Sequence, residues 1–188
     1  MNRWFTADTH FNHKLITEMR GMPGGMGFRN VTEHDEFIIT TWNNFVGKKD
    51  EVWHLGDFCF GTHEIVRSIR ARLNGKIHLI LGNHDYANRI FNIKGCFTSF
   101  NDIKEIKFGS GRSVILCHYA MRVWSKSHYN SGQLFGHSHG KLKGLGKQYD
   151  VGLDNTGFRL LMDSDIIEIM HKLPDNINLI KEKEGIIW

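Results

Sequence analysis

The sequence predicts an α/β fold built from two sheets, and two observations lead to this class. First, five short apolar runs each end beside a polar residue that can bind a metal ion: 4–7, 52–55, 77–81, 114–117 and 133–135. Such strand ends are typical of open α/β sheets, because the loops that follow neighbouring strands converge in one crevice. Second, residues 1–85 alternate strands with helical segments, whereas the second half contains closely spaced strands. A sheet with helices on its outer face, packed against a second sheet, accommodates both halves.

The first half has a βαβ-like order. We expect, in sequence, a strand at 4–7, a short helix at 11–20, a longer helix from Asn30, a strand ending at Asp57, a helix at 63–73 and a strand ending at Asn83. Asn30 and Glu33 have the spacing of a capping box, and apolar residues recur every four positions in 63–73. The connections are long enough for parallel pairing of the strands.

The second half predicts a series of short strands, at 97–100, 103–108, 113–117, 133–135 and 148–153. Their close spacing favours mostly antiparallel neighbours. Residues 163–171 have the pattern of a short helix or strand, and 181–184 form a polar tail. We expect one domain over 1–188, with 174–188 as a C-terminal extension.

A glycine-rich segment, 20–28, cannot form regular structure and predicts a loop. One interpretation is a simple connector. The other is a mobile flap beside the site, in which Arg20 or Arg29 meets a phosphate group.

Composition narrows the class of protein. The chain has 188 residues, 40% of them apolar and 12% aromatic, which excludes a disordered chain and suits one domain with a real core. The net charge of +4 is spread along the chain and does not by itself indicate nucleic-acid binding. Three cysteines without a C-x-x-C pair indicate a reducing compartment. With no signal peptide or membrane span in the pattern, we expect a cytoplasmic protein.

The polar residues after the apolar runs form motifs that are individually weak. Asp8-x-His10 and Gly56-Asp57 are common in unrelated proteins. The segment 82–85, Gly-Asn-His-Asp, is more specific, and so is 136–139, Gly-His-Ser-His, because two histidines separated by one residue at a strand end face the same side. Their occurrence together, in this order and each after an apolar run, indicates a metal site with more ligands than one ion needs.

The order D-x-H, G-D, G-N-H-D, H, G-H-x-H resembles the calcineurin-like metallophosphoesterase superfamily. Asp8 and His10, Asp57, 82–85, His118 and 136–139 match its five blocks, so the resemblance covers about residues 3–160. It implies a four-layer α/β/β/α sandwich of two mixed sheets with a dinuclear metal centre at one edge.

Carried over by position, the resemblance implies two sets of ligands. The first ion would be held by Asp8, His10, Asp57 and His139, and the second by Asp57, Asn83, His118 and His137. Asp57 would bridge two cations about 3.5–4 Å apart. Imidazole with carboxylate and amide oxygens favours Mn, Fe, Zn, Co or Ni over Mg, and among these we favour Mn.

The resemblance also implies catalytic roles for His84 and Asp85. A hydroxide that bridges the two metals would attack phosphorus in line, while His84 stabilises or protonates the leaving oxygen. We expect Asp85 to orient the His84 ring and thereby fix its tautomer.

Four further residues are candidates for substrate binding: His13, Arg29, Tyr119 and Arg122. For His13 a structural role at a helix start is an equal alternative, and for Tyr119 and Arg122 packing is the alternative. His54 lies mid-strand before Asp57, and we interpret it as a core histidine or one that supports the metal ligands.

Departures from the family pattern bear on the substrate. Where Ser/Thr protein phosphatases continue Gly-Asp with Asp, Arg and Gly, this chain has Phe58-Cys59-Phe60-Gly61. We therefore expect a compact phosphoesterase acting on phosphodiesters, or monoesters, of a small or nucleotide-type substrate, with nucleic acid not indicated, no membrane partner and an unknown oligomeric state. The alternative is a non-catalytic protein-binding scaffold of the same fold.

Overall fold

The computed structural model describes residues 1–21, 27–109 and 111–180. The centre of the glycine-rich segment 20–28 and the expected polar tail at 181–184 lie outside these ranges. Within them, no helix combines the length and the apolar character needed to cross a bilayer.

The first sheet has the strand order β4-β3-β2-β1-β9. Its strands are β1 (Arg3–Thr6), β2 (Glu51–His54), β3 (Lys76–Ile80), β4 (Ser99–Asn101) and β9 (Leu161–Met162). Strands β1 to β4 run parallel, and β9 pairs antiparallel with β1. The predicted βαβ order of the first half is confirmed, with α2 (Val31–Phe45) between β1 and β2 and α3 (His63–Arg72) between β2 and β3.

Local signals explain how α2 begins. The Asn30 side chain accepts a hydrogen bond from the Glu33 backbone N–H, as the capping spacing predicts. In a complete capping box, the Glu33 carboxylate would accept a hydrogen bond from the backbone N–H of Asn30. Here it accepts one from the backbone N–H of Arg29 instead, so the capping box is incomplete. The short helix expected at 11–20 is reduced to α1 (Ile16–Met19).

The second sheet has the order β5-β6-β7-β8, with strands β5 (Ile103–Lys107), β6 (Ser113–Cys117), β7 (Gly132–Phe135) and β8 (Gln148–Asp150). Only β5 and β6 are antiparallel, while β6, β7 and β8 run parallel. The expectation of mostly antiparallel neighbours was therefore wrong. Few residues separate β5 from β6 in the sequence, whereas the segments 118–131 and 136–147 are long enough to bring the chain back so that the next strand starts beside the start of the previous one.

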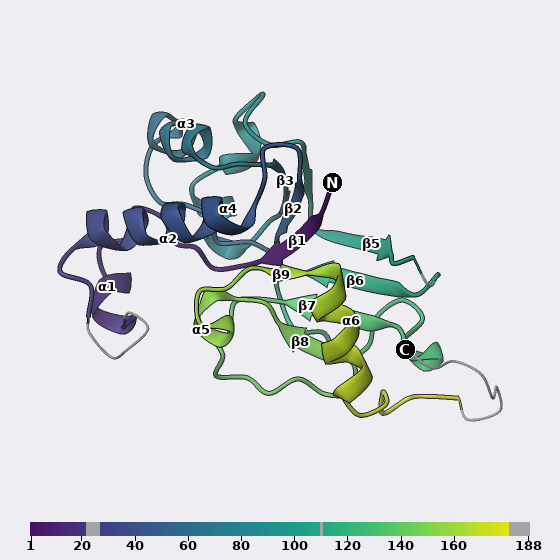
Figure 1. The fold of residues 1–188 in the computed structure, drawn as a ribbon. Helices are drawn as coiled ribbons and strands as arrows, with labels where there is room; N and C mark the ends of the chain where they lie inside the picture. The colour runs from purple at the N-terminus through teal and green to yellow at the C-terminus, as the bar shows by residue number, and fades with distance from the viewer. Residues whose placement is uncertain (22–26, 110, 181–188) are drawn as a thin grey trace.

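Figure 1 shows the two sheets and the helices around them. Two hydrophobic cores hold these layers together. One lies between the outer face of the first sheet and the helices α2 and α3, where Trp42 is fully buried. The other lies between the two sheets and includes Phe5 of β1 and Leu134 of β7. Helix α6 (Asp163–Lys172) packs Ile166 and Met170 into this second core. Two mixed sheets with helices around them confirm the predicted class and are consistent with a sandwich.

The parallel strands bring their carboxyl ends to shared edges of the two sheets. The loops after β1, β2 and β3 leave the first sheet on the same side, and an isolated parallel bridge joins Ala7 after β1 to Gly152 after β8. The short helices α4 (Asn83–Ala87) and α5 (Leu153–Thr156) begin in this region. The fold therefore gathers residues from across the chain at one place.

Candidate metal centre

The first group of candidate ligands is Asp8, His10 and His139. Each offers one ligand atom, and these atoms lie within 4.8 Å of one another. Asp8 and His10 follow β1 and are buried, whereas His139 follows β7 and is partly exposed. The Nε2 atoms of His10 and His139 are 3.3 Å apart, so the two rings point at a common position. We call this group the first triad.

The second group is Asp57, His118 and His137, whose candidate ligand atoms also lie within 4.8 Å of one another. These residues follow β2, β6 and β7, so both sheets contribute. Asp57 and His118 are buried, and His137 is exposed. The side-chain oxygen of Asn83 lies 3.2 Å from His118 Nε2, beside this second triad.

Asp57, a member of the second triad, also approaches the first. Its Oδ2 atom is 3.5 Å from Nε2 of His118 in the second triad and 3.8 Å from Nε2 of His10 in the first. Its other oxygen accepts a hydrogen bond from the His84 backbone N–H. One carboxylate oxygen therefore faces a histidine from each group.

The backbone is strained where it presents these side chains. Five of the residues in the triads have positive φ angles: Asp8 at 57°, His10 at 47°, Asp57 at 57°, His137 at 65° and His139 at 49°. Non-glycine residues rarely adopt this region, at a cost of about 1–3 kcal/mol each, and such strain gathers at functional sites. The surrounding structure therefore holds the ligand loops in an unfavourable backbone conformation.

Two glycines leave room for the ligands. A Cβ on Gly56, whose φ is 97°, would overlap the His118 ring, and one on Gly82 would overlap the Asp57 side chain and backbone. The Gly56-Asp57 and Gly82-Asn83 motifs thus need glycine because the loops after β2 and β3 approach the second triad closely.

Burial governs the electrostatics of the first triad. Desolvation and the neighbouring Asp57 carboxylate raise the pKa of Asp8 well above its ordinary value. Desolvation, with the nearby Arg20 cation, lowers the pKa of His10 and keeps its ring neutral, the form that binds metals. His10 Nδ1 is buried without a hydrogen-bond partner among the described residues. A bound cation would offset the repulsion between the two buried carboxylates.

Two residues support the first triad: Asp154, which the sequence patterns did not single out, and Arg20, whose interpretation as a phosphate contact does not match its buried pairing with Asp154. Asp154 accepts a hydrogen bond of 2.6 Å from His139 Nδ1 and binds the buried Arg20 guanidinium. Burial alone would raise the pKa of Asp154, but these two partners hold it well below the ordinary value. In the second triad, His118 Nδ1 instead donates to the Leu55 backbone oxygen at 2.7 Å. Asp154 directly follows the strand expected at 148–153, but that segment is not an apolar run and β8 (Gln148–Asp150) is polar, so the rule of apolar runs ending in ligands passed over it.

His84 lies at the rim of the site. Its Nε2 is 3.9 Å from Asp57 Oδ2, and its side chain is 38% exposed. Its ring is 4.6 Å from that of Phe60 and 5.6 Å from that of His10, measured between centroids. His84 therefore combines access to solvent with proximity to the carboxylate between the triads.

The Asp85 carboxylate does not contact the His84 ring, contrary to the expectation that it orients this ring. Its two carboxylate oxygens accept backbone N–H groups of Asp57, Phe58 and Gly82, at 2.8–2.9 Å. Complete burial raises its pKa to about 7 against the opposing effect of these hydrogen bonds. The carboxylate turns inward because these three N–H groups would otherwise be buried without partners. Asp85 thus shapes the loop that carries Asp57, rather than the His84 ring.

The candidate substrate-binding residues are dispersed. His13 stacks edge-on against Phe60, with its ring centroid 5.7 Å from His10 and 6.4 Å from His84. Tyr119 lies beside the second triad, with its ring against His137 and its hydroxyl 3.5 Å from the Asn83 side-chain oxygen. Arg122 is exposed, and no hydrogen bond or ion pair engages its side chain over the described ranges.

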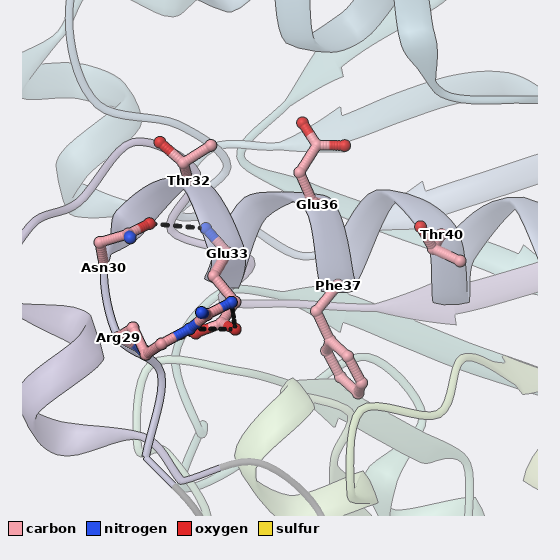
Figure 2. A pocket seen from close by; sticks show the side chains of 7 residues that line it. All are labelled: Arg29, Asn30, Thr32, Glu33, Glu36, Phe37 and Thr40. Carbon is pink, nitrogen blue, oxygen red and sulfur yellow. Dashed lines mark hydrogen bonds and ion pairs between the residues drawn. The ribbon is translucent and has the colours of Figure 1, made fainter.

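Arg29 lies elsewhere. It pairs with Glu33 on the outer face of α2, where it lines a shallow pocket with Asn30, Thr32, Glu36, Phe37 and Thr40 (Figure 2). None of the triad residues lines this pocket. His54 is fully buried and shares a 2.9 Å hydrogen bond with the Thr9 hydroxyl, in agreement with the core interpretation.

The chain matches no protein-family model. It is 38% identical over 87 residues to the Gene 66 protein of Mycobacterium phage L5, a match covering 45% of this chain and 40% of the phage protein. It is 37% identical over 92 residues to the uncharacterized protein MJ1445 of Methanocaldococcus jannaschii, covering 48% of this chain and 50% of that protein. Each of these matches therefore spans half or less of the curated relative.

Its structure is similar to the crystal structure of AQ665, a protein of unknown function from Aquifex aeolicus. The TM-score is 0.69 with 22% sequence identity, and the match covers 89% of this chain and 98% of that one. At this identity the likeness shows a shared fold.

Proposed function

We propose that this protein is a dinuclear metal-dependent phosphoesterase of the calcineurin-like type, a hydrolase that cleaves phosphodiester bonds in a small or nucleotide-type substrate. The observation that carries the proposal is the position of Asp57, whose one carboxylate oxygen lies 3.5 Å from His118 and 3.8 Å from His10. A carboxylate oxygen that faces a histidine of each group is well suited to bridge a pair of close cations.

The residues present fit such a pair. Three features support the fit: buried carboxylates close to one another, a His10 ring whose lowered pKa keeps it neutral and whose Nε2 converges with that of His139, and a buried His10 Nδ1 without a partner among the described residues. The first ion would be held by Asp8, His10, Asp57 and His139, and the second by Asp57, Asn83, His118 and His137. This donor set suits divalent transition metals, with Mn²⁺ our first choice.

Hydrolysis adds water across one P–O bond, so the leaving oxygen must acquire a proton. Two bound cations would supply Lewis acidity to the phosphoryl oxygens and lower the pKa of water at the site. His84 would donate the proton to the leaving oxygen, a role supported by its partial exposure and its distance of 3.9 Å from Asp57. His13 lies beside His84, and Tyr119 lies beside Asn83, so both would contact a substrate bound at the metals.

The preference for diesters is supported by the engagement of Arg20 and Arg29, the two arginines that flank the glycine-rich segment. A terminal phosphate monoester carries an additional charge that enzymes commonly bind with an arginine fork. All five N–H donors of Arg20 are engaged by protein groups, and Arg29 pairs with Glu33 away from the triads. These contacts leave neither arginine as a clamp for a monoester.

The test is an assay of Mn²⁺-loaded protein on bis(p-nitrophenyl) phosphate and p-nitrophenyl phosphate, with elemental analysis of the same sample. We expect two ions per chain and faster turnover of the diester. A panel of cyclic nucleotides and dinucleotides would then identify the substrate class. Two bound ions without turnover of any of these esters would reject the enzyme and favour a protein-binding scaffold.

A further inference from the structure

The strongest feature outside the candidate ligands is a buried ion pair between Arg20 and Asp154. The guanidinium donates from Nε to Oδ1 at 2.8 Å and from an Nη to Oδ2 at 2.6 Å, so the contact is bidentate. The Arg20 side chain is only 2% exposed. The two residues are 134 positions apart, at the end of α1 and within α5.

Asp154 also determines which nitrogen of His139 carries the proton. Its Oδ2 lies 2.6 Å from His139 Nδ1, and an ionised carboxylate can only accept a hydrogen bond. Nδ1 therefore carries a proton, and Nε2 is the nitrogen that faces His10 Nε2, at 3.3 Å. A carboxylate behind a metal-binding histidine fixes both the tautomer and the ring orientation.

Arg20 connects this arrangement to the loop that carries Asp8. The same Nη atom that binds Asp154 donates to the Asp8 backbone oxygen at 2.6 Å, and the other Nη contacts the Thr9 oxygen at 3.3 Å and His34 Nε2 at 3.2 Å. One planar group thus ties the strained loop after β1 to the side chain that orients His139. A lysine cannot make this set of contacts, because it lacks the fork.

We propose that Arg20 and Asp154 are a positioning pair that builds the first triad, with Asp154 holding His139 in its metal-binding tautomer and Arg20 locking Asp154 to the Asp8 loop. Over the described ranges, the second triad has no equivalent charged pair, since His118 Nδ1 donates its hydrogen bond to the backbone oxygen of Leu55. The inference rests on the metal centre in the proposed function, and it predicts that the pair acts on one ion and not the other.

The first measurement is the tautomer of His139 in metal-free protein, read from long-range ¹H–¹⁵N correlation spectra. We expect Nδ1–H in the wild type and a shift toward Nε2–H in Asp154→Ala. Asp154→Asn keeps the size of the side chain and one acceptor oxygen, so it replaces Asp154→Ala if the alanine variant fails to fold. We expect it to give a smaller shift in the same direction. Because this readout needs neither metal nor substrate, its failure is separate from a failure of the phosphoesterase proposal.

The second measurement is Mn²⁺ affinity by calorimetry. Loss of a residue that supports a ligand typically weakens metal binding about 10–100-fold, and we expect this loss at one of the two ions in Asp154→Ala. Arg20→Lys should weaken the same ion, and the double variant should be little worse than Asp154→Ala alone, since both act through one contact.

Asp163→Asn is the matched control, because it breaks another arginine–aspartate pair, with Arg3, at the amino end of β1. It should leave both ions and the tautomer unchanged. A folded Asp154→Ala protein with Nδ1–H on His139 and both affinities at wild-type values would overturn the proposal, and would reduce the pair to a structural contact.

Discussion

The two triads use the same residue types but are held in different ways. The first is enclosed: Asp8 and His10 are buried, and a charged pair behind His139 is itself largely buried. The second opens outward, because His137 is exposed and His118 depends on a neutral backbone oxygen. Asp57 of the second triad also approaches the first, because its Oδ2 lies 3.8 Å from His10 Nε2 and 3.5 Å from His118 Nε2.

This difference assigns different tasks to the two groups. A buried cluster supported by fixed charges cannot rearrange without exposing unpaired groups, so it suits an ion that stays in place. An exposed ligand can move aside when substrate enters. Tyr119 also lies against His137, with ring centroids 4.8 Å apart, at the open side. We therefore expect substrate to approach from the second triad and His84, and the variants below test this asymmetry.

The largest effect should come from Asp57→Asn, which removes the carboxylate of the second triad that also faces His10 of the first. We expect loss of both ions and a fall in activity beyond the roughly 10⁴-fold upper range of general acid–base catalysis. The asparagine oxygen can still accept the His84 backbone N–H. Elemental analysis and the ester assay measure the outcome, and retention of two ions would contradict a shared ligand.

The same variant should be at least as stable as the wild type when metal is absent. Buried Asp8 has a raised pKa because of desolvation and its neighbour Asp57, so neutralising Asp57 relieves repulsion. Thermal unfolding of the two metal-free proteins provides this control. A marked fall in Tm would instead attribute the lost ions to a damaged fold.

His84→Ala should separate chemistry from metal binding. His84 lies 3.9 Å from Asp57 but belongs to neither triad, so both ions should remain. If it donates the proton to the leaving oxygen, kcat should fall roughly 10²–10⁴-fold. Parallel assays with a nitrophenolate leaving group and a poorer alkoxide should show the larger loss with the alkoxide. An equal loss for both esters would remove the proton-donor role.

Chelation should distinguish the triads directly. In Mn²⁺-loaded protein treated with EDTA, we expect the ion of the second triad to leave first, because solvent reaches its exposed ligand His137. His137→Ala should abolish the fast phase and leave the slow one, whereas His10→Ala should abolish the slow phase. Stopped-flow metal release with a Mn²⁺ indicator follows both phases. A single phase in the wild-type protein would show that the asymmetry of burial does not govern exchange.

The sequence predicted which candidate ligands converge better than it predicted the residues that hold them in position. Asp8, His10, Asp57, His118 and the 136–139 histidines follow apolar runs, and parallel strands necessarily bring such ends together. The role of Arg20 could not be seen in this way, because its partner is 134 residues distant and a pair at that separation leaves no local pattern. The inward turn of Asp85 has a similar cause, since the N–H groups of Asp57 and Phe58 that it satisfies belong to another loop.

The pairing of the second sheet escaped prediction for a related reason. Strand spacing indicates whether a tight hairpin can form, and it did so correctly for β5 and β6. Strand spacing cannot tell whether the longer segments 118–131 and 136–147 connect antiparallel or parallel neighbours. That choice places His118 and His137 at the same sheet edge, and it depends on packing between the layers.

Tyr119→Phe should have the smallest effect and is the finest test of the open side. The hydroxyl is 3.5 Å from the Asn83 oxygen, a weak contact, so its loss should not release an ion. If substrate enters beside the second triad, KM for the diester should rise a few-fold while kcat and metal content stay constant. Tyr129→Phe, on η2 (Ser127–Tyr129), is the control that should change neither constant. A rise in KM with His13→Gln but not with Tyr119→Phe would place the substrate on the side of the first triad, and would reverse the asymmetry argued from burial.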